Sequence, residues 1–483
     1  MDKFFKSLQE NAKRYPSSLA FIGSNVVLNY RGLEQSINNI ATKALSLDIK
    51  PGSSVCVRCQ NPNVQLLTNL GLMRAGMKVA IATKPEIFAE HDFTFDVFIT
   101  DGAAAKGWEY KANKGIRLTA DWSQPHQFSK RKIADHPYSL IFASSGSTGH
   151  GKLLEASRKN VEYRIGLKEK EPYFHADTRF LSLAQPNSMT TFADMLITLM
   201  NGGQVIRLGL MPPERSLDAI TVYQPTYVSA APYSLVGMLD SLTSSRRRFR
   251  KVEYLRVAGA YCAPDVRKKA KDLFADNVIT SYGATETGRI AFGEYDEIAG
   301  VEGAVGKVIP GFEIEALDDE GNALPAGTDG ELRMKPPAGS ALTYITAEGP
   351  KDPLKDGWFY PGDIGHVTED NVLVISGRKS NVINFGGNKL DPERIEAAIR
   401  LMDGVDDVAV AAQPGANGFD VIHCLVEGAG RLTAADMNAF LVSSGQSFQV
   451  ESVHKVNAIP RTDTNKISRP GVLEAVQGKL KNG

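Results

Sequence analysis

Hydrophobic positions along this 483-residue chain follow two alternating spacings, one typical of helices and one typical of strands. Near the start, Phe4, Phe5 and Leu8 mark one face of an amphipathic helix. The short apolar runs at 19–22 and 25–28 flank a Gly-Ser pair and predict a β-hairpin. We therefore expect the chain to open with a helix followed by paired strands.

The alternation of strands and helices continues through the following residues. Asn29 and Pro62 are expected to begin helices, and a further helix is predicted at 191–199. The predicted strands cover 55–57, 79–82, 96–99, 140–143, 180–184, 204–208, 227–230 and 254–258. Strands that alternate with helices imply parallel sheets covered on both faces, which is the doubly wound α/β class.

Two later changes of pattern predict further parts of the fold. Short β segments separated by turns cover 313–337 and predict a β subdomain. Beyond residue 378 the chain has enough strands and helices for a small α+β domain. Because the chain is too long for one core, we expect a large N-terminal domain over 1–378 and a small C-terminal domain over 379–483.

Composition and charge narrow the class of protein. The formal net charge is zero, which gives no reason to expect nucleic acid as a partner. No stretch approaches the ~20 apolar residues that span a bilayer. Four cysteines in so long a chain do not make a disulfide framework, and Cys56 and Cys59 should point to opposite faces of one strand as packing residues. We expect a protein of the reducing cytoplasm.

The stretch 139–152 (SLIFASSGSTGHGK) carries the clearest chemical signal. An apolar strand gives way to glycines and hydroxyl residues, whose backbone N–H groups can surround an anion, and Lys152 adds a positive charge. The spacing also fits the P-loop of nucleotide triphosphatases. However, Leu153 stands where a magnesium-binding Ser or Thr belongs, and Ser157, a candidate N-cap, begins the next helix too late. A polyphosphate loop of another kind and a plain flexible turn both stay open at this point.

Four later motifs follow this loop in order. They are 281–287 (SYGATET), 357–365 (GWFYPGDIG), 376–379 (SGRK) with 386–396 (GGNKLDPERIE), and 460–467 (PRTDTNKI). Together with the loop, they resemble the signature motifs of the adenylate-forming superfamily, which comprises acyl-CoA synthetases, peptide-synthetase adenylation domains and firefly luciferase. The resemblance extends over essentially the whole chain.

The resemblance implies a site that holds ATP and Mg²⁺. Its implied nucleotide-binding residues are Ser144, Ser145, Gly146, Ser147, Thr148, Gly149, Lys152, Gly259, Ala260, Tyr282, Gly283, Asp363 and Arg378. Thr148 and Glu286 would lie near the magnesium, and Thr285 would bind the α-phosphate. Asp363 would accept hydrogen bonds from the ribose hydroxyls. Lys466 would be the catalytic lysine, with Thr285 and Glu286 also in the catalytic group.

Neither the carboxylic acid that is activated nor the thiol that accepts the acyl group is identified at this point. Members that activate amino acids carry an aspartate where this chain has Ser188-Met189, so an α-amino acid is disfavoured. The implied acid pocket at 185–189, 258–261 and 284–288 suits an aryl or an aliphatic acid. Coenzyme A is the expected acceptor, an acyl carrier protein is the alternative, and a non-catalytic nucleotide sensor is a third hypothesis. The quaternary state, monomer or homodimer, is equally open.

Departures from the family pattern concern the shape of the loops. Gly151 and Leu153 replace the usual Pro and Gly around Lys152, and Asn465 replaces the Gly before Lys466. In this family the C-terminal domain swings about a hinge, and here Ser380 stands where the hinge is usually Asp or Lys.

Overall fold

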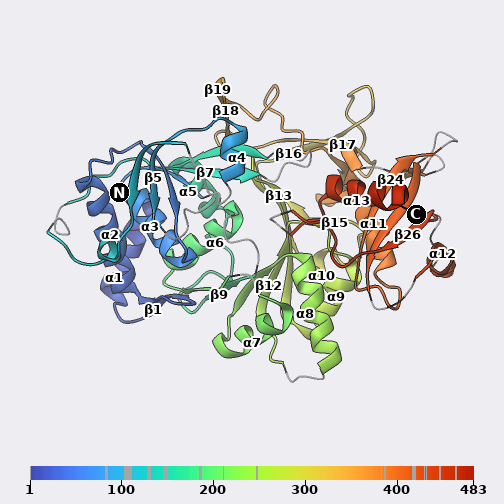
Figure 1. The fold of residues 1–483 in the computed structure, drawn as a ribbon, viewed down its shortest axis with the longest axis horizontal. Coiled ribbons are helices and arrows are strands. Elements are labelled where there is room, and N and C mark those ends of the chain that lie inside the picture. Colours follow the sequence, from blue (N-terminus) through green and yellow to red (C-terminus); the bar gives the residue numbers. More distant parts are fainter. Residues whose placement is uncertain are drawn as a thin grey trace. The chain divides into compact units, whose positions relative to one another are not determined.

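The computed structural model describes residues 2–482 apart from 82–84, 103–110, 128–131, 145–150, 184–187, 210, 246–248, 382, 386–387, 416–419, 429, 431, 445, 447 and 463–464. Figure 1 shows the helices and strands along the chain, and contacts between residues divide the chain into two compact units. The first unit comprises Met1–Gly259, Lys268–Tyr295 and Pro336–Phe359. The second comprises Ala260–Arg267, Asp296–Lys335 and Tyr360–Gly483. The predicted boundary at residue 378 stays a prediction.

One sheet of the first unit is mainly parallel. Its strands lie in the order β14-β13-β12-β11-β9-β10-β1-β2. Their bounds are β1 Leu19–Gly23, β2 Val27–Asn29, β9 Arg179–Ser182, β10 Gln204–Arg207, β11 Tyr227–Ala230, β12 Val252–Ala258, β13 Ala275–Ala284 and β14 Gly288–Glu294. The strands from β1 to β13 in this order pair in parallel, and β2 and β14 pair antiparallel at the two ends.

The second sheet of this unit has the strand order β19-β18-β8-β7-β4-β3-β5-β6. Its strands are β3 Ser54–Arg58, β4 Lys78–Ala80, β5 Phe95–Thr100, β6 Ala112–Arg117, β7 Ser139–Ser144, β8 Lys152–Ser157, β18 Thr343–Thr346 and β19 Gly349–Lys351. Pairing is parallel from β7 to β6 and antiparallel from β7 to β19. The mixed α/β class predicted from the sequence is confirmed.

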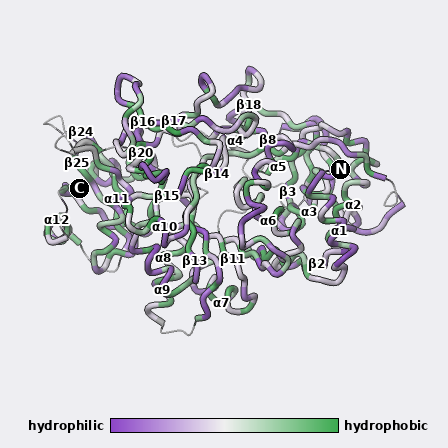
Figure 2. Tube along the Cα trace, turned by 180° about the vertical axis from the view of Figure 1, so that it is seen from behind, coloured by the Kyte–Doolittle hydropathy of each residue, from purple (hydrophilic) through white to green (hydrophobic). Residues whose placement is uncertain are grey.

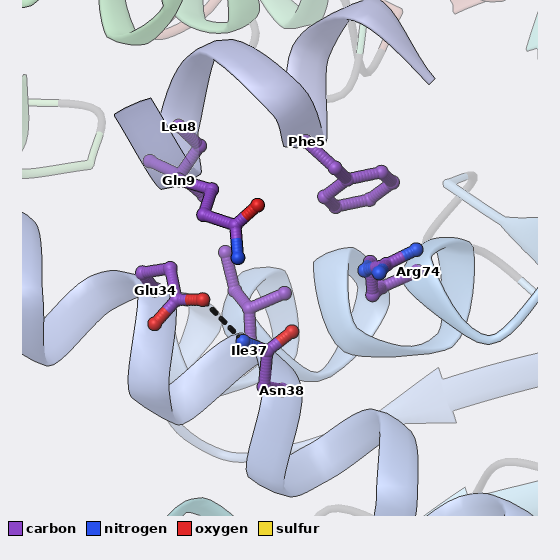
Figure 3. A pocket seen from close by; sticks show the side chains of 7 residues that line it. All are labelled: Phe5, Leu8, Gln9, Glu34, Ile37, Asn38 and Arg74. Carbon is purple, nitrogen blue, oxygen red and sulfur yellow. Dashed lines mark hydrogen bonds between the residues drawn. The ribbon is translucent and has the colours of Figure 1, made fainter. Parts of the chain in front are cut away.

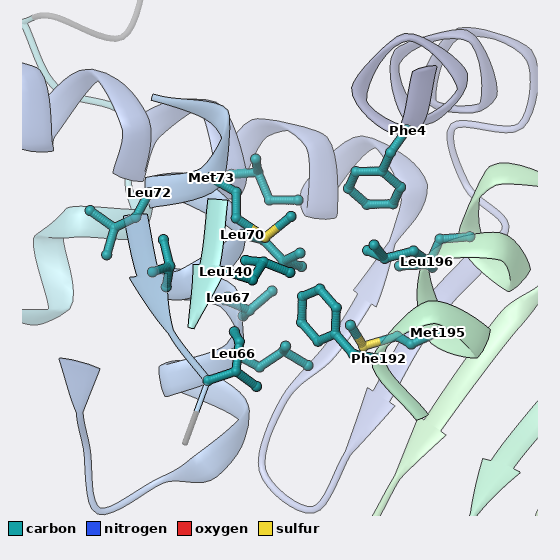
Figure 4. Packing of buried hydrophobic residues seen from close by; sticks show 14 of the residues in the cluster. Phe4, Leu66, Leu67, Leu70, Leu72, Met73, Leu140, Phe192, Met195 and Leu196 are labelled. Atoms are coloured by element: carbon teal, nitrogen blue, oxygen red, sulfur yellow. The ribbon is translucent and has the colours of Figure 1, made fainter. Parts of the chain in front are cut away.

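Helices of the first unit bury apolar faces against these sheets. They are α1 Lys3–Arg14, α2 Tyr30–Ser46, α3 Pro62–Arg74, α4 Pro85–Glu90, η1 Ala120–Ser123, α5 Arg158–Gly166, α6 Met189–Met200, α7 Pro213–Tyr223 and α8 Pro232–Ser245. Figure 4 shows side chains from α1, α3 and α6, among them Phe4, Leu70 and Phe192, meeting in one core with Leu140 of β7. This core fixes β7, the strand that leads into the loop with the phosphate-binding pattern.

The second unit contains an antiparallel set of strands in the order β16-β17-β20-β21-β15 and a small α+β part. The first set comprises β15 Ala304–Val308, β16 Glu313–Leu317, β17 Gly330–Lys335, β20 Asp363–Val367 and β21 Val372–Arg378. The second comprises η2 Lys379–Asn381, β22 Ile383–Phe385, β23 Asn388–Leu390, α11 Pro392–Ile399, β24 Asp407–Pro414, β25 Asp420–Glu427, α12 Ala434–Ser443, β26 Ser452–Lys455 and α13 Arg469–Asn482. The division between the units falls inside α9 Pro264–Leu273 and at the start of α10 Tyr295–Ile298.

Local signals in the sequence correspond closely to these elements. Asn29 caps α2 by accepting a hydrogen bond from the Gly32 N–H, as predicted. Cys56 and Cys59 are both buried, and they pack in different hydrophobic clusters, as expected for residues on opposite faces. Along the chain, hydrophobic and hydrophilic residues alternate over short distances (Figure 2). Among the described residues, no helix is long and apolar enough to cross a membrane.

A buried ion network joins α6 to the first sheet. Asp194 of α6 contacts Lys168 and lies 2.5 Å from the Arg256 guanidinium, and Arg256 also donates to the Ser229 hydroxyl at 2.8 Å. Burial alone would raise the pKa of Asp194, but the two cations outweigh burial and hold it below its usual value. The Asp194 carboxylate is therefore ionised and paired with two cations inside the protein.

Candidate active site

The loop with the phosphate-binding pattern connects two antiparallel strands of the second sheet. Ser144 ends β7, Lys152 begins β8, and the two residues lie opposite each other in the strand register. Residues Ser145, Gly146, Ser147, Thr148 and Gly149 lie outside the described residues. A P-loop runs directly into a helix, whereas here Lys152 runs into a strand and α5 begins only after the Ser157 cap. The sequence-based rejection of a P-loop is confirmed.

Lys152 and Glu286 are connected by two hydrogen bonds to one tyrosine hydroxyl. The Lys152 ammonium lies 4.9 Å from the ring centroid of Tyr344 and donates to the Tyr344 hydroxyl at 3.4 Å. That hydroxyl in turn donates to Glu286 Oε1 at 3.0 Å. Glu286 is only 8% exposed, so it is not the solvated surface carboxylate that an isolated motif would suggest. The sequence analysis missed Tyr344, which belongs to none of the motifs.

Glu286 lies in the tight turn that joins β13 to β14. The turn spans Thr285–Thr287, and Gly288 closes it with a φ of +86°, a conformation that favours glycine. At Gly283 a Cβ atom would come within 2.3 Å of the Gly288 carbonyl oxygen, so no larger residue fits there. The motif glycine thus serves the close approach of two strands, and the turn presents Thr285 and Glu286 together.

Arg164 of α5 holds this turn from inside the protein. Its Nη2 donates to the carbonyl oxygens of Thr285 and Glu286 at 2.8 and 3.2 Å. Burial lowers the pKa of Arg164 to about 10, partly offset by the Glu286 carboxylate, so the guanidinium stays charged at neutral pH. No sequence motif marks Arg164, because its partners lie more than a hundred residues away in the chain.

We expect Arg164→Leu to destabilise the protein by about 1–3 kcal/mol, because the buried Glu286 carbonyl and the partly buried Thr285 carbonyl lose their donor. Urea denaturation followed by circular dichroism measures the change. Arg158→Leu on the same helix is the matched control: its ion pair with Asp135 is partly exposed, and such pairs contribute little. Equal stability of the two variants would contradict the role given to Arg164.

In the second unit, Asp363 and Arg378 form an ion pair at neighbouring strand ends. They are partners in the β20–β21 register, and Arg378 Nε donates to Asp363 Oδ1 at 2.9 Å. Asp363 is 3% exposed, whereas the Arg378 side chain is 40% exposed. The pair therefore combines a fixed carboxylate with a cation that solvent can reach, as binding of a ribose phosphate requires.

The loop that carries Lys466 is held in a tight turn. The Thr462 N–H donates to the Lys466 carbonyl at 2.7 Å, and Arg461 Nη1 donates to the Asn465 carbonyl at 2.8 Å. Arg461 also pairs with Asp407 of β24, which anchors the loop to the sheet. Asn465 has a φ of +61°, a left-handed conformation that glycine favours and asparagine tolerates. Its replacement of the usual glycine therefore preserves the turn.

The Asp363–Arg378 pair and Glu393 are near enough to Lys466 for their charges to act on its pKa. The residue is exposed over much of its surface, but protein atoms crowd its charged end. This burial, together with Arg378, lowers the pKa of Lys466, and Glu393 and Asp363 partly oppose the shift. The surroundings of Lys466 thus disfavour its positive charge, and an anionic ligand beside it would offset that cost.

The other predicted residues are placed as follows. Tyr282 and Gly283 lie in β13, and Gly259 follows β12 with a φ of +100°. Ala260, next in the chain, is exposed and belongs to the second unit. The structure gathers Lys152, Thr285 and Glu286 in the first unit, and Asp363, Arg378 and Lys466 in the second. That both groups serve one nucleotide stays a prediction.

Two small hollows lie elsewhere in the described part of the first unit. The larger, about 30 Å³, is lined by Phe5, Leu8, Gln9, Glu34, Ile37, Asn38 and Arg74 (Figure 3). It has room for a water molecule but not for an organic ligand. Neither it nor its smaller neighbour includes a motif residue.

The acidic and hydroxyl groups suit magnesium rather than zinc. No cluster of three or more His, Cys, Asp or Glu that could hold a metal is found among the described residues. Glu286 offers a buried carboxylate with one oxygen hydrogen-bonded to Tyr344, and Mg²⁺ bound with phosphates needs only one or two protein carboxylates. The Glu286 carboxylate therefore fits a magnesium ion that binds together with a nucleotide.

The phosphate-binding pattern between β7 and β8 and the four later motifs are those of the adenylate-forming enzymes, the class that the sequence resembles. The family model for AMP-binding enzymes matches residues 8–345, which is more than half of the chain. The chain therefore belongs to the AMP-binding enzyme family. The resemblance seen in the motifs is confirmed, as is the prediction of an AMP-forming acid–thiol ligase.

Relatives and solved structures align over nearly the full chain. A "Salicylyl-CoA synthase / salicylate adenylyltransferase" of a Streptomyces species is 24% identical, covering 98% of this chain and 93% of the relative. An "Oxalate--CoA ligase" of Arabidopsis thaliana is also 24% identical, covering 96% of each chain. The crystal structure of the anthranilate CoA ligase AuaEII with anthranoyl-AMP superimposes with a TM-score of 0.86 at 17% identity, covering 99% of this chain and 98% of that one. That likeness confirms the fold.

Proposed function

We propose that this enzyme activates a carboxylic acid with ATP and passes the acyl group to coenzyme A. In the first step a carboxylate oxygen attacks the α-phosphorus of ATP, the bond to the pyrophosphate group breaks, and an acyl-adenylate forms. In the second step the thiol sulfur attacks the acyl carbon, loses its proton and displaces AMP. The observation that supports the proposal is the buried Asp363, paired with Arg378 in the same unit as Lys466 and near enough for both charges to act on the pKa of that lysine.

Because the first step brings several negative charges together, its catalysis is mainly positioning and charge stabilisation. In our assignment Lys152 meets the β- and γ-phosphates, Thr285 the α-phosphate and Tyr282 the adenine. Asp363 and Arg378 hold the ribose, and Lys466 lies between the substrate carboxylate and the α-phosphate. Thr148 and Glu286 would hold Mg²⁺, which supplies charge neutralisation on the phosphates when bound.

The proposed acid lacks an α-amino group. Ser188 accepts a hydrogen bond from the Thr191 N–H as the cap of α6, and the adjoining Met189 is buried, so neither offers a carboxylate to an ammonium. Asp194, further along α6, is already paired with two cations. The names of the two relatives also refer to acids without an α-amino group, salicylate and oxalate.

Pyrophosphate release over a panel of acids, with and without coenzyme A, tests the proposal. The panel holds a hydroxybenzoate, a short aliphatic acid, a dicarboxylate and an α-amino acid. We expect release with at least one of the first three, and a thioester only when coenzyme A is present. Release without any thioester would favour an acyl carrier protein as acceptor, and no release with any acid would overturn the proposal.

A further inference from the structure

Tyr344 stands between the two charged groups that the proposed function assigns to the polyphosphate and its metal. Its hydroxyl accepts from the Lys152 ammonium at 3.4 Å and donates to Glu286 Oε1 at 3.0 Å. We propose that Tyr344 is a positioning residue for adenylation, which keeps Lys152 and Glu286 one hydroxyl apart so that each can meet its own part of magnesium-bound ATP. This inference rests on the proposed function of the site.

The backbone around Tyr344 is fixed to both of its partners. Tyr344 of β18 pairs with Leu154 of β8, so its ring lies diagonally across from Lys152 on the same face of the sheet. Two residues earlier, the Leu342 N–H donates to the Glu286 carbonyl at 2.8 Å. The segment thus joins the first residue of β8 to the turn that presents Glu286.

Helix α5 reinforces this arrangement. The Asn160 side chain donates to the carbonyls of Gly339 and Ala341 at 2.9 and 3.1 Å. Arg164, one turn further along the same helix, holds the Glu286 carbonyl. One rigid helix therefore fixes both the strand that carries Tyr344 and the turn that carries Glu286, which is the support that a precisely placed side chain needs.

The Tyr344 hydroxyl separates two groups of opposite charge, the Lys152 ammonium and the Glu286 carboxylate. The Tyr344 hydroxyl donates to the Glu286 carboxylate and accepts from the Lys152 ammonium, so one neutral group satisfies both charges at once. Without that hydroxyl, a long lysine side chain is free to pair directly with the carboxylate. Such a pair would neutralise the groups that should engage phosphate and magnesium, so ATP would have to compete with an internal ion pair.

Tyr344→Phe isolates the hydroxyl, because phenylalanine keeps the ring against Lys152. The matched control is Tyr15→Phe, whose ring has the Arg14 guanidinium 5.1 Å away at the end of α1, remote from the motifs in sequence. We expect Tyr344→Phe to weaken binding of magnesium-ATP about 10- to 50-fold, measured by calorimetry, as expected for loss of a hydrogen bond to a charged group. Tyr15→Phe should bind like the wild type.

A double-mutant cycle with Glu286→Gln shows whether the effect acts through the carboxylate. Tyr344→Phe should have little further effect on the magnesium-ATP affinity when Glu286 is already Gln, whereas a general loss of fold would lower binding in both backgrounds. Wild-type affinity in Tyr344→Phe would overturn the inference. A wild-type enzyme that binds magnesium-ATP but releases no pyrophosphate would overturn the proposed function, and the affinity comparison would still decide the role of Tyr344.

Discussion

Lys466→Ala should lose acyl-adenylate formation by about 10²–10³-fold while its affinity for ATP stays unchanged, as expected when one preorganised charge is removed from a transition state. The substrate carboxylate and the α-phosphate repel each other as they approach, and Lys466 is the cation assigned between them. Its pKa is lowered by burial and by Arg378, so negative charge that develops beside it would stabilise its charged form. ATP–pyrophosphate exchange measures the first step by itself.

Lys455→Ala is the matched control, since Lys455 is an exposed lysine at the end of β26 in the same unit. It should exchange pyrophosphate like the wild type. Lys466→Arg retains the charge but changes its shape, so it should recover part of the rate if charge dominates and none if the position of the ammonium is decisive. Unchanged exchange in Lys466→Ala would remove this lysine from the mechanism.

Local elements of the fold could be predicted because their causes are local. A short polar side chain placed just before a helical pattern identified the caps Asn29 and Ser157, and in the structure both accept the expected backbone hydrogen bonds. The late start of α5 followed from Ser157, and it separated this loop from a P-loop without any knowledge of the fold. In both cases the relevant partner lies within four residues.

The residues that hold the candidate site residues in place could not be predicted from local sequence patterns. Tyr344 and Arg164 reach Glu286 from 58 and 122 residues away in the chain, and only the folded sheet and α5 bring them there. Neither residue stands in a pattern that a sequence window would single out. The motifs assign certain side chains to the ligand, which stays a prediction, whereas the residues that hold those side chains in place depend on tertiary packing.

Asn465 lies between these two cases, because the sequence identifies the position but only the structure shows its effect. The sequence marks it as a departure from the usual glycine, and from sequence alone its effect on the loop stays open. Its φ of +61° shows that the loop keeps the conformation for which glycine is favoured, and Arg461 binds its carbonyl. A substitution pattern can therefore be interpreted only once the backbone angle at that position is known.

Asp363→Asn should raise the KM for ATP about 100-fold, because a carboxylate that accepts two ribose hydroxyls provides two charge-assisted hydrogen bonds. Asp363 is buried and held by Arg378 at 2.9 Å, so asparagine fits the same space but removes the charge. The sharper measurement is the preference for ATP over 2′-deoxy-ATP. The wild type should prefer ATP, because 2′-deoxy-ATP lacks the hydroxyl that donates to the Asp363 carboxylate. In Asp363→Asn that hydrogen bond is already weak, so the variant should lose most of the preference.

A control and a stability measurement separate this effect from damage to the fold. Asp319→Asn makes the same chemical change at an exposed position beyond β16 and should leave both KM and nucleotide preference unchanged. Because Arg378 loses its ion partner, Asp363→Asn could also lower stability, so its melting temperature is compared with that of the wild type. A folded variant that still prefers ATP as strongly as the wild type would show that the ribose is recognised elsewhere, and the assignment of the Asp363–Arg378 pair would fail.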